Sequence, residues 1–78
     1  MLEIEIEYLM KEGYMIVFNP VCDNEMDIQV FKDGCGYIHR VRYDEYLLEI
    51  YNLDYIIRQG IHIAKKRVDR MIELNENK

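Results

Sequence analysis

The most informative absence in this chain of 78 residues is that of serine and threonine, which occur at no position. Their absence excludes hydroxyl nucleophiles of these two types, the G-x-S-x-G nucleophile elbow and the Walker A motif. The only closely spaced glycines, Gly34 and Gly36, belong to a predicted hairpin turn and not to a strand-to-helix junction, so they imply no phosphate cradle. The sequence also shows no convergent acid–base pair that could act in place of a hydroxyl nucleophile. We therefore expect a protein that is not an enzyme and needs no cofactor.

Cysteine, histidine and long apolar runs are also scarce. Two cysteines are too few for a disulfide scaffold, and we expect both to be free thiols. No pair among the two cysteines and two histidines has the spacing of metal ligands, so we expect no metal site. No apolar run approaches 18 residues, and glutamates stand where an export signal would carry lysines. These patterns predict a cytoplasmic location and no membrane association.

Charge is divided unevenly along the chain. Residues 1–57 carry twelve acidic and four basic side chains, whereas residues 58–78 carry six basic and three acidic ones. The net charge of the whole chain is −5. Such an asymmetry indicates a charged partner for one part or the other, or two parts that partly neutralise each other.

The last third of the chain predicts a long helix at 53–75, around which the fold is built. Asn52 is a favourable N-cap, and Asp54 lies in the first turn, where the helix dipole favours a carboxylate. The apolar residues recur at spacings of three and four, which places them on one side of a helix. These residues are Leu53, Ile57, Gly60, Ile61, Ala64, Val68, Met71 and Ile72.

Residues 26–42 predict a β-hairpin with a two-residue turn. Asp33 and Gly34 form a dipeptide that a type I′ turn favours, because both central residues of that turn have positive φ. This turn gathers apolar side chains on one face and pairs opposite charges on the other, whereas a three-residue loop would mix the faces. The predicted pairs are Lys32–Cys35, Phe31–Gly36, Val30–Tyr37, Gln29–Ile38, Ile28–His39, Asp27–Arg40, Met26–Val41 and Glu25–Arg42.

The remaining segments complete an α+β fold. Residues 2–12 alternate like a strand but also show helical spacing, and Gly13 is placed as a helix-ending glycine, so we predict a helix. Residues 14–19 predict a strand that is apolar on both faces and therefore central or covered. Residues 43–51 predict a short helix capped by Asp44. The expected single domain, 1–78, has the order α-β-β-β-α-α, with a three-stranded antiparallel meander and helices on one face.

Two surfaces are candidates for binding. Acidic residues around the predicted sheet could present a carboxylate array to a basic groove, in the place of nucleic-acid phosphates. Basic residues on the long helix could instead contact phosphates, although the rest of the domain is acidic and would be repelled, so we expect no direct binding to nucleic acid. The acidic set is Asp23, Glu25, Asp27, Asp33, Asp44 and Glu45. The basic set is Lys65, Lys66, Arg67 and Arg70.

The element order carries a distant resemblance. A short helix ending in Lys-Glu-Gly-Tyr, a strand, a polar loop, a hairpin with an Asp-Gly turn and then helices, all acidic, resembles small phage-encoded inhibitors over about residues 1–60. The type II-A anti-CRISPR family, which blocks the DNA-binding groove of Cas9 as a DNA mimic, is similar in order and character. The resemblance implies an inhibitor or regulator whose acidic residues engage a host nucleic-acid-handling protein. The basic helix at the end of this chain departs from that pattern.

The length of the last helix suggests self-association. A helix over 53–75 spans about 34 Å, whereas strands of six or seven residues span only about 20–23 Å. We expect the Val68–Leu74 end to project past the sheet with its apolar groups exposed in a monomer, unless the first helix covers them. A homodimer formed through the C-terminal helix would bury them, and a host protein could cover the same surface. A structural homodimeric accessory protein is therefore an alternative to the inhibitor.

Overall fold

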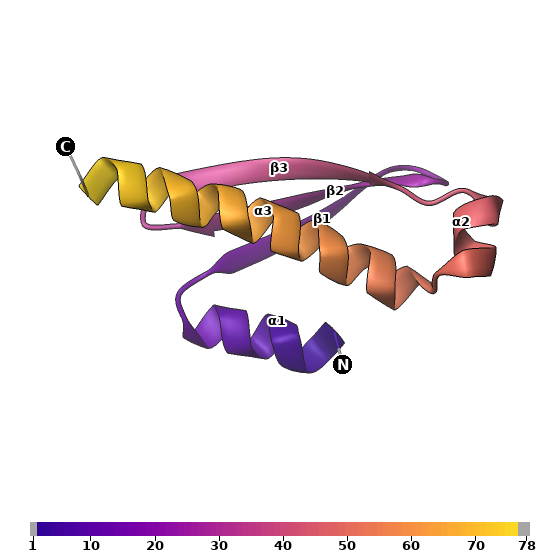
Figure 1. Ribbon diagram of the computed structural model, residues 1–78, viewed down its shortest axis with the longest axis horizontal. Coiled ribbons are helices and arrows are strands. Elements are labelled where there is room, and N and C mark those ends of the chain that lie inside the picture. The colour runs from indigo at the N-terminus through magenta and orange to yellow at the C-terminus, as the bar shows by residue number, and fades with distance from the viewer. Residues whose placement is uncertain (1, 77–78) are drawn as a thin grey trace.

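The computed structural model describes residues 2–76 and has the predicted α+β architecture, a three-stranded antiparallel sheet with helices before and after it. The molecule is elongated, with principal extents of 44 × 22 × 18 Å. Figure 1 shows α3 running along the sheet and α1 next to α3. Helix α2 lies at the end of the molecule opposite the C-terminal end of α3. The elements are α1 (Leu2–Lys11), β1 (Met15–Cys22), β2 (Glu25–Lys32), β3 (Cys35–Arg42), α2 (Glu45–Ile50) and α3 (Leu53–Glu76).

The β2–β3 hairpin has the predicted register at all eight pairs, from Lys32–Cys35 at the turn to Glu25–Arg42 at the open end. Asp33 and Gly34 have φ of 52° and 77°, so both central residues of the turn are left-handed, as a type I′ turn requires. The alternation of side chains then divides the sheet into a face covered by α3 and an open face.

The first strand lies at an edge of the sheet, because the strand order is β1-β2-β3. Of the two possibilities expected for residues 14–19, a central or a covered strand, the central one is therefore wrong, while Ile16 and Phe18 pack against the core. The strand is also longer than expected, since it continues through Pro20, where the pairing with β2 shifts by a bulge between Pro20 and Cys22. Proline is tolerated there because an edge strand has one side without ladder hydrogen bonds.

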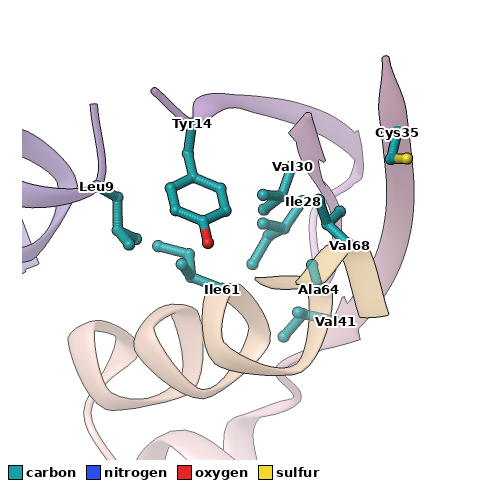
Figure 2. Close-up of a cluster of buried hydrophobic side chains, with 9 residues drawn as sticks. All are labelled: Leu9, Tyr14, Ile28, Val30, Cys35, Val41, Ile61, Ala64 and Val68. Atoms are coloured by element: carbon teal, nitrogen blue, oxygen red, sulfur yellow. The ribbon is translucent and has the colours of Figure 1, made fainter. Parts of the chain in front are cut away.

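The core lies between α3 and the covered face of the sheet. Its largest fully buried side chains are Ile28 and Val30 of β2 and Val68 of α3. Figure 2 shows Ile28, Val30, Ile61, Ala64 and Val68 gathered between the strands and α3, with Leu9 and Tyr14 entering from the side of α1 and Cys35 apart from them on its strand. Gly60 brings α3 close to the sheet, because its backbone lies against Ile28. The cysteines are free, with Cys22 exposed and Cys35 buried.

The contacts of α3 show that it runs antiparallel to β3 and remains on the sheet to its end. Gly60 lies against Val41, near the end of β3, and the Arg67 guanidinium lies 5.9 Å from the centre of the Tyr37 ring. Asn75 donates a hydrogen bond to the Cys35 thiol at 3.3 Å, at the start of β3. The expectation that the apolar groups of the helix end are exposed is therefore wrong for Val68, which is buried, and for Met71 and Ile72, which are partly buried against the core. Leu74 is 49% exposed, as expected.

The ambiguous first segment is a helix, and the reason is its C-terminal cap. Gly13 has φ of 96° and donates to the Met10 carbonyl, while the Tyr14 amide donates to the Leu9 carbonyl at 3.0 Å. This is a Schellman motif, in which the two residues that close it, Leu9 and Tyr14, also bury their side chains. Glu5 joins the helix to α3 through Arg58 at 2.7 Å.

Within residues 2–76, no helix has the length and apolar character needed to cross a membrane.

Candidate functional site

Helix α2 is the element that contributes least to the core, because none of its six residues is buried or packs against the core cluster. Its conformation is set by local capping. The Asp44 carboxylate accepts a hydrogen bond from the Leu47 amide at 2.8 Å, as predicted for an N-cap. The Tyr51 ring, just after the helix, stacks on Tyr55 of α3 with centroids 5.1 Å apart. The chain therefore keeps an ordered helix outside its own core.

The exposed side chains of α2 are strongly apolar. Tyr46 is 69% exposed, and Leu48 and Ile50 are also exposed. Single exposed apolar residues are ordinary, but several on one short helix mark an interaction surface. The sequence correctly predicted a helix here. Among residues 2–76, however, its apolar side chains do not belong to the core cluster or pack against it.

Carboxylates surround the same apolar residues. Asp23 from the β1–β2 loop, Asp44 and Glu45 line an open hollow of about 960 Å³ together with residues of α2. These are three of the six acidic residues that the sequence singled out. Glu49 also lines the hollow and was missed, although it lies four residues after Glu45 and so shares its side of the helix. The hollow is lined by Asp23, Asn24, Tyr43, Asp44, Glu45, Tyr46, Leu48 and Glu49; we call this set the α2 hollow.

The other three candidate carboxylates lie elsewhere. Glu25 and Asp27 are on the open face of the sheet, where Arg42 and Arg40 neutralise them at 2.9 and 2.8 Å. The hydrogen bond from Arg40 lowers the pKa of Asp27. Asp33 lies in the β2–β3 turn, near the end of α3 marked by the Asn75–Cys35 contact. The six carboxylates therefore do not form one surface.

The four basic candidates on α3 are spread around the helix. Lys65 binds Asp69 at 2.7 Å and lies near Tyr14, on the side of α1. Arg67 lies over Tyr37, on the side of β3. Arg70 pairs with Glu73 at 3.4 Å, and Lys66 is exposed on the outer side. These side chains do not converge on one groove that a phosphate backbone could follow.

A second, mostly apolar hollow of about 370 Å³ separates α1 from α3, with Ile4 and Tyr8 on one side and Ile61 and His62 on the other. Two of the polar side chains at its rim are already engaged in ion pairs, Glu5 with Arg58 and Lys65 with Asp69. Among residues 2–76, no group of three or more His, Cys, Asp or Glu side chains is placed to hold a metal ion. The α2 hollow is therefore the candidate site that combines exposure, charge and apolar area.

The ion pairs give a pH dependence of stability that can be tested. Hydrogen bonding to Arg58 lowers the pKa of Glu5. Burial alone would raise the pKa of Asp69, but the hydrogen bonds from Lys65 and Tyr14 outweigh burial and lower it. Carboxylates with a lowered pKa stabilise the fold above their unfolded pKa, about 4, and this stabilisation is lost as the pH falls through the folded value. We expect the urea midpoint, followed by circular dichroism, to fall below about pH 4.

A Glu5→Gln variant isolates one of these contributions. It removes the titrating partner of Arg58, so its urea midpoint should be lower than that of the wild type at pH 7 and nearly equal at about pH 3. The comparison cancels the opposite effect of protonating the remaining acidic surface, which relieves repulsion in both proteins. A difference between the two proteins that grows as the pH falls would contradict the assignment.

Comparison with known proteins gives no relative, since no family model, no curated protein sequence and no solved structure matches this chain.

Proposed function

We propose that the protein is a small non-enzymatic binding protein, an inhibitor or regulator of the anti-CRISPR kind from a phage or mobile element. Its partner is a host nucleic-acid-handling protein with a basic groove, such as a Cas9-type nuclease. The observation that carries the proposal is the α2 hollow, where an ordered helix with no buried residue combines exposed apolar side chains with carboxylates.

The charges of the hollow specify the kind of partner. Asp23, Asp44, Glu45 and Glu49 face the same open space. Each would be paired with an arginine or lysine of a basic groove, and electrostatic attraction would speed the encounter. A groove built to bind phosphates offers such cations. A DNA mimic needs carboxylates at accessible positions, and this end of the molecule supplies four of them.

The apolar side chains supply what charge alone lacks. Exposed ion pairs contribute little affinity each, about 0–1 kcal/mol, whereas buried aromatic side chains are common anchors of interfaces. Tyr46 and Leu48 lie among the carboxylates, so a partner that pairs the charges also covers these apolar groups. The combination supports a protein partner, because a nucleic acid would be repelled by the carboxylates.

The test uses two matched double variants. Glu45→Gln with Glu49→Gln neutralises two carboxylates of the hollow, and Glu3→Gln with Glu7→Gln neutralises two exposed carboxylates on α1 at the same spacing. Proteins captured from bacterial lysate by the wild type should be released by the first pair and retained by the second. With a purified captured protein, the first pair should weaken binding about tenfold, equivalent to about 1.4 kcal/mol. A guide-loaded type II-A nuclease is the first purified partner to measure.

The salt dependence of binding and an assay of nucleic-acid binding test the proposal further. Binding through the α2 hollow should weaken as salt rises, because exposed charges are screened beyond about 8 Å at physiological ionic strength. Equal loss of binding in both double variants would place the contact elsewhere. Tight binding to DNA or RNA in a gel-shift assay at moderate salt would instead favour the basic residues of α3.

A further inference from the structure

Strand β3 has a free edge that is regular along its whole length. Among the described residues 2–76, it pairs only with β2, over eight consecutive residues without a bulge or proline. In a two-residue hairpin the pair that closes the turn is hydrogen-bonded, and hydrogen-bonded and non-hydrogen-bonded pairs then alternate. Since Lys32–Cys35 closes the turn, the backbone groups that point away from β2 are those of Gly36, Ile38, Arg40 and Arg42.

The two edges of the sheet differ. Edge strands in monomeric proteins are often protected by proline, bulges or covering elements. The edge strand β1 carries Pro20 and a bulge before Cys22. Strand β3 has neither feature, and it is therefore the edge that can accept another strand.

Exposed apolar side chains flank the free edge on both faces. Ile38 is 54% exposed on the open face of the sheet. On the covered face, Ile63 of α3 is 42% exposed and borders a groove of about 380 Å³ between α3 and β3. Leu74, two helical turns beyond Arg67 on the same side of α3, is 49% exposed. The β3 edge, Ile38, Ile63 and Leu74 form one surface, which we call the β3 flank.

We propose that the β3 flank is the interface of a homodimer in which two copies of β3 pair antiparallel across a twofold axis at Ile38. The pairing joins two three-stranded sheets into one of six strands. It places the two α3 helices side by side on the same face. The occupant is a second copy, because a single extended peptide would pair with the strand but leave the flank of α3 uncovered.

The position of α3 fits this geometry. Gly60 contacts both Ile28 of β2 and Val41 of β3, so the helix lies over the space between these two strands. Strands are about 4.8 Å apart, which places β3 about 2.4 Å and α3 about 5 Å from the twofold axis. The two helices would then be about 10 Å apart, within the range of 8–10 Å at which helices pack. Pairing the strands therefore brings the helices to contact distance without rearrangement.

The side chains on the open face are compatible with the twofold axis. Pairing Ile38 with Ile38 of the second copy places Arg40 opposite Gly36 of that copy. Gly36 has no side chain, and the Phe31 ring covers it so closely that an added Cβ would lie 2.5 Å from that ring. Arg40 therefore keeps its ion pair with Asp27 of its own copy and meets no opposing side chain across the axis.

The area is sufficient for a weak dimer. Strand β3 has eight residues and is about 26 Å long, and the sheet and helix layers together are about 20 Å deep. Each copy thus contributes roughly 500 Å², or about 1,000 Å² in total, which is near the lower limit for a specific interface. We expect a Kd on the order of 10–100 µM.

Sedimentation equilibrium between about 5 and about 500 µM tests the proposal. The wild type should pass from monomer to dimer over this range. Ile38→Lys should raise the Kd at least tenfold, because a lysine at the edge opposes its own copy across the axis. Met15→Lys adds the same charge to the open face at the other edge, on β1, and should dimerise like the wild type. A wild-type monomer throughout, or equal behaviour of the two variants, would overturn the proposal.

A second pair of variants separates this dimer from the proposed partner binding. Ile63→Lys should weaken dimerisation and leave capture through the α2 hollow intact, whereas Leu48→Lys should do the reverse. The dimer should also persist at about 0.5 M salt, because salt screens the repulsion between the two copies of Arg67 near the axis. Dimerisation that is lost with Leu48→Lys and retained with Ile63→Lys would place the interface at α2 and contradict the β3 flank.

Discussion

Replacing Ile28 by alanine is expected to lower the free energy of unfolding by about 2–5 kcal/mol. Ile28 is fully buried at the centre of the middle strand, and its Cδ1 lies against the backbone of Gly60 in α3. Truncation to alanine removes the buried contacts that the Ile28 side chain makes with the sheet and with α3. It leaves a cavity, because β2 is held in place by hydrogen bonds to both neighbouring strands. The native stability of a domain is only about 5–15 kcal/mol, so this single change would remove a large part of it.

Thermal unfolding followed by circular dichroism measures the effect of Ile28→Ala. For a domain of this size, 1 kcal/mol corresponds to about 4–8 °C in Tm, so a loss of roughly 10 °C or more is expected. Ile4→Ala is the matched control, because Ile4 is exposed on α1 and lies outside both the β3 flank and the α2 hollow. The control should change stability by no more than about 0.5 kcal/mol. Similar Tm values for the two variants would show that Ile28 is not at the centre of the core.

Replacing Gly60 by leucine is expected to destabilise the protein in the opposite way, by overfilling the same contact. A Cβ at Gly60 would lie 2.6 Å from Ile28 Cδ1 and 2.8 Å from Val41 Cγ2, closer than carbon atoms can approach. Leucine improves helix propensity by about 1 kcal/mol, but overpacking costs about 1–3 kcal/mol and occasionally more. Because leucine adds three further carbons beyond Cβ, we expect a net loss of about 2 kcal/mol.

The adjacent residue gives a direct control for Gly60→Leu. Gln59 is exposed at the solvent-open groove between α3 and β3, so Gln59→Leu introduces the same side chain into the same helix at a position where a Cβ is already accommodated. Urea unfolding should give a lower midpoint for Gly60→Leu and a nearly unchanged midpoint for Gln59→Leu. A stability gain from Gly60→Leu would mean that α3 can move away from the sheet at no cost.

Local signals predicted most of the fold. The Asp33–Gly34 turn determines its own φ angles and, through them, the register of every β2–β3 pair. The cap residues are equally local. Backbone hydrogen bonds around Gly13 close α1, and the Asp44 carboxylate accepts from the Leu47 amide at the start of α2. These features depend on neighbours in the chain, and one sequence is enough to identify them.

The errors concern which surfaces are covered, a property that depends on distant residues. The apolar residues of β1 indicated a central or a covered strand, and the central alternative is wrong, because in a meander of three strands β1 lies at an edge. The comparison of lengths misled the estimate for α3. A 24-residue helix is about 36 Å long and an eight-residue strand about 26 Å, so α3 is longer than the sheet, but length alone does not say which end projects. Asn75 reaches Cys35, and Val68 is buried.

The candidate site was predicted in part. Asp23, Asp44 and Glu45 are brought together by the fold, although 21 positions separate the first two. Glu25 and Asp27 were singled out for their charge, yet the same hairpin register that was predicted already placed Arg42 and Arg40 opposite them. Applying that register to the acidic set would have removed both residues. The apolar half of the α2 hollow could not be found this way, because helical spacing does not say what covers a helix.

The shape of the molecule determines how it should be handled in a binding assay. Helix α2, which lines the α2 hollow, lies at the opposite end of the molecule from the C-terminal end of α3, as Figure 1 shows, and the molecule is 44 Å long. Attachment to a sensor surface through the C-terminal side would therefore present the hollow outward with free access. Attachment through a reagent at the exposed thiol of Cys22 would instead place the anchor one residue from Asp23 and block that site. Comparing the two attachments therefore distinguishes a partner that binds at the α2 end of the molecule from one that binds along its side.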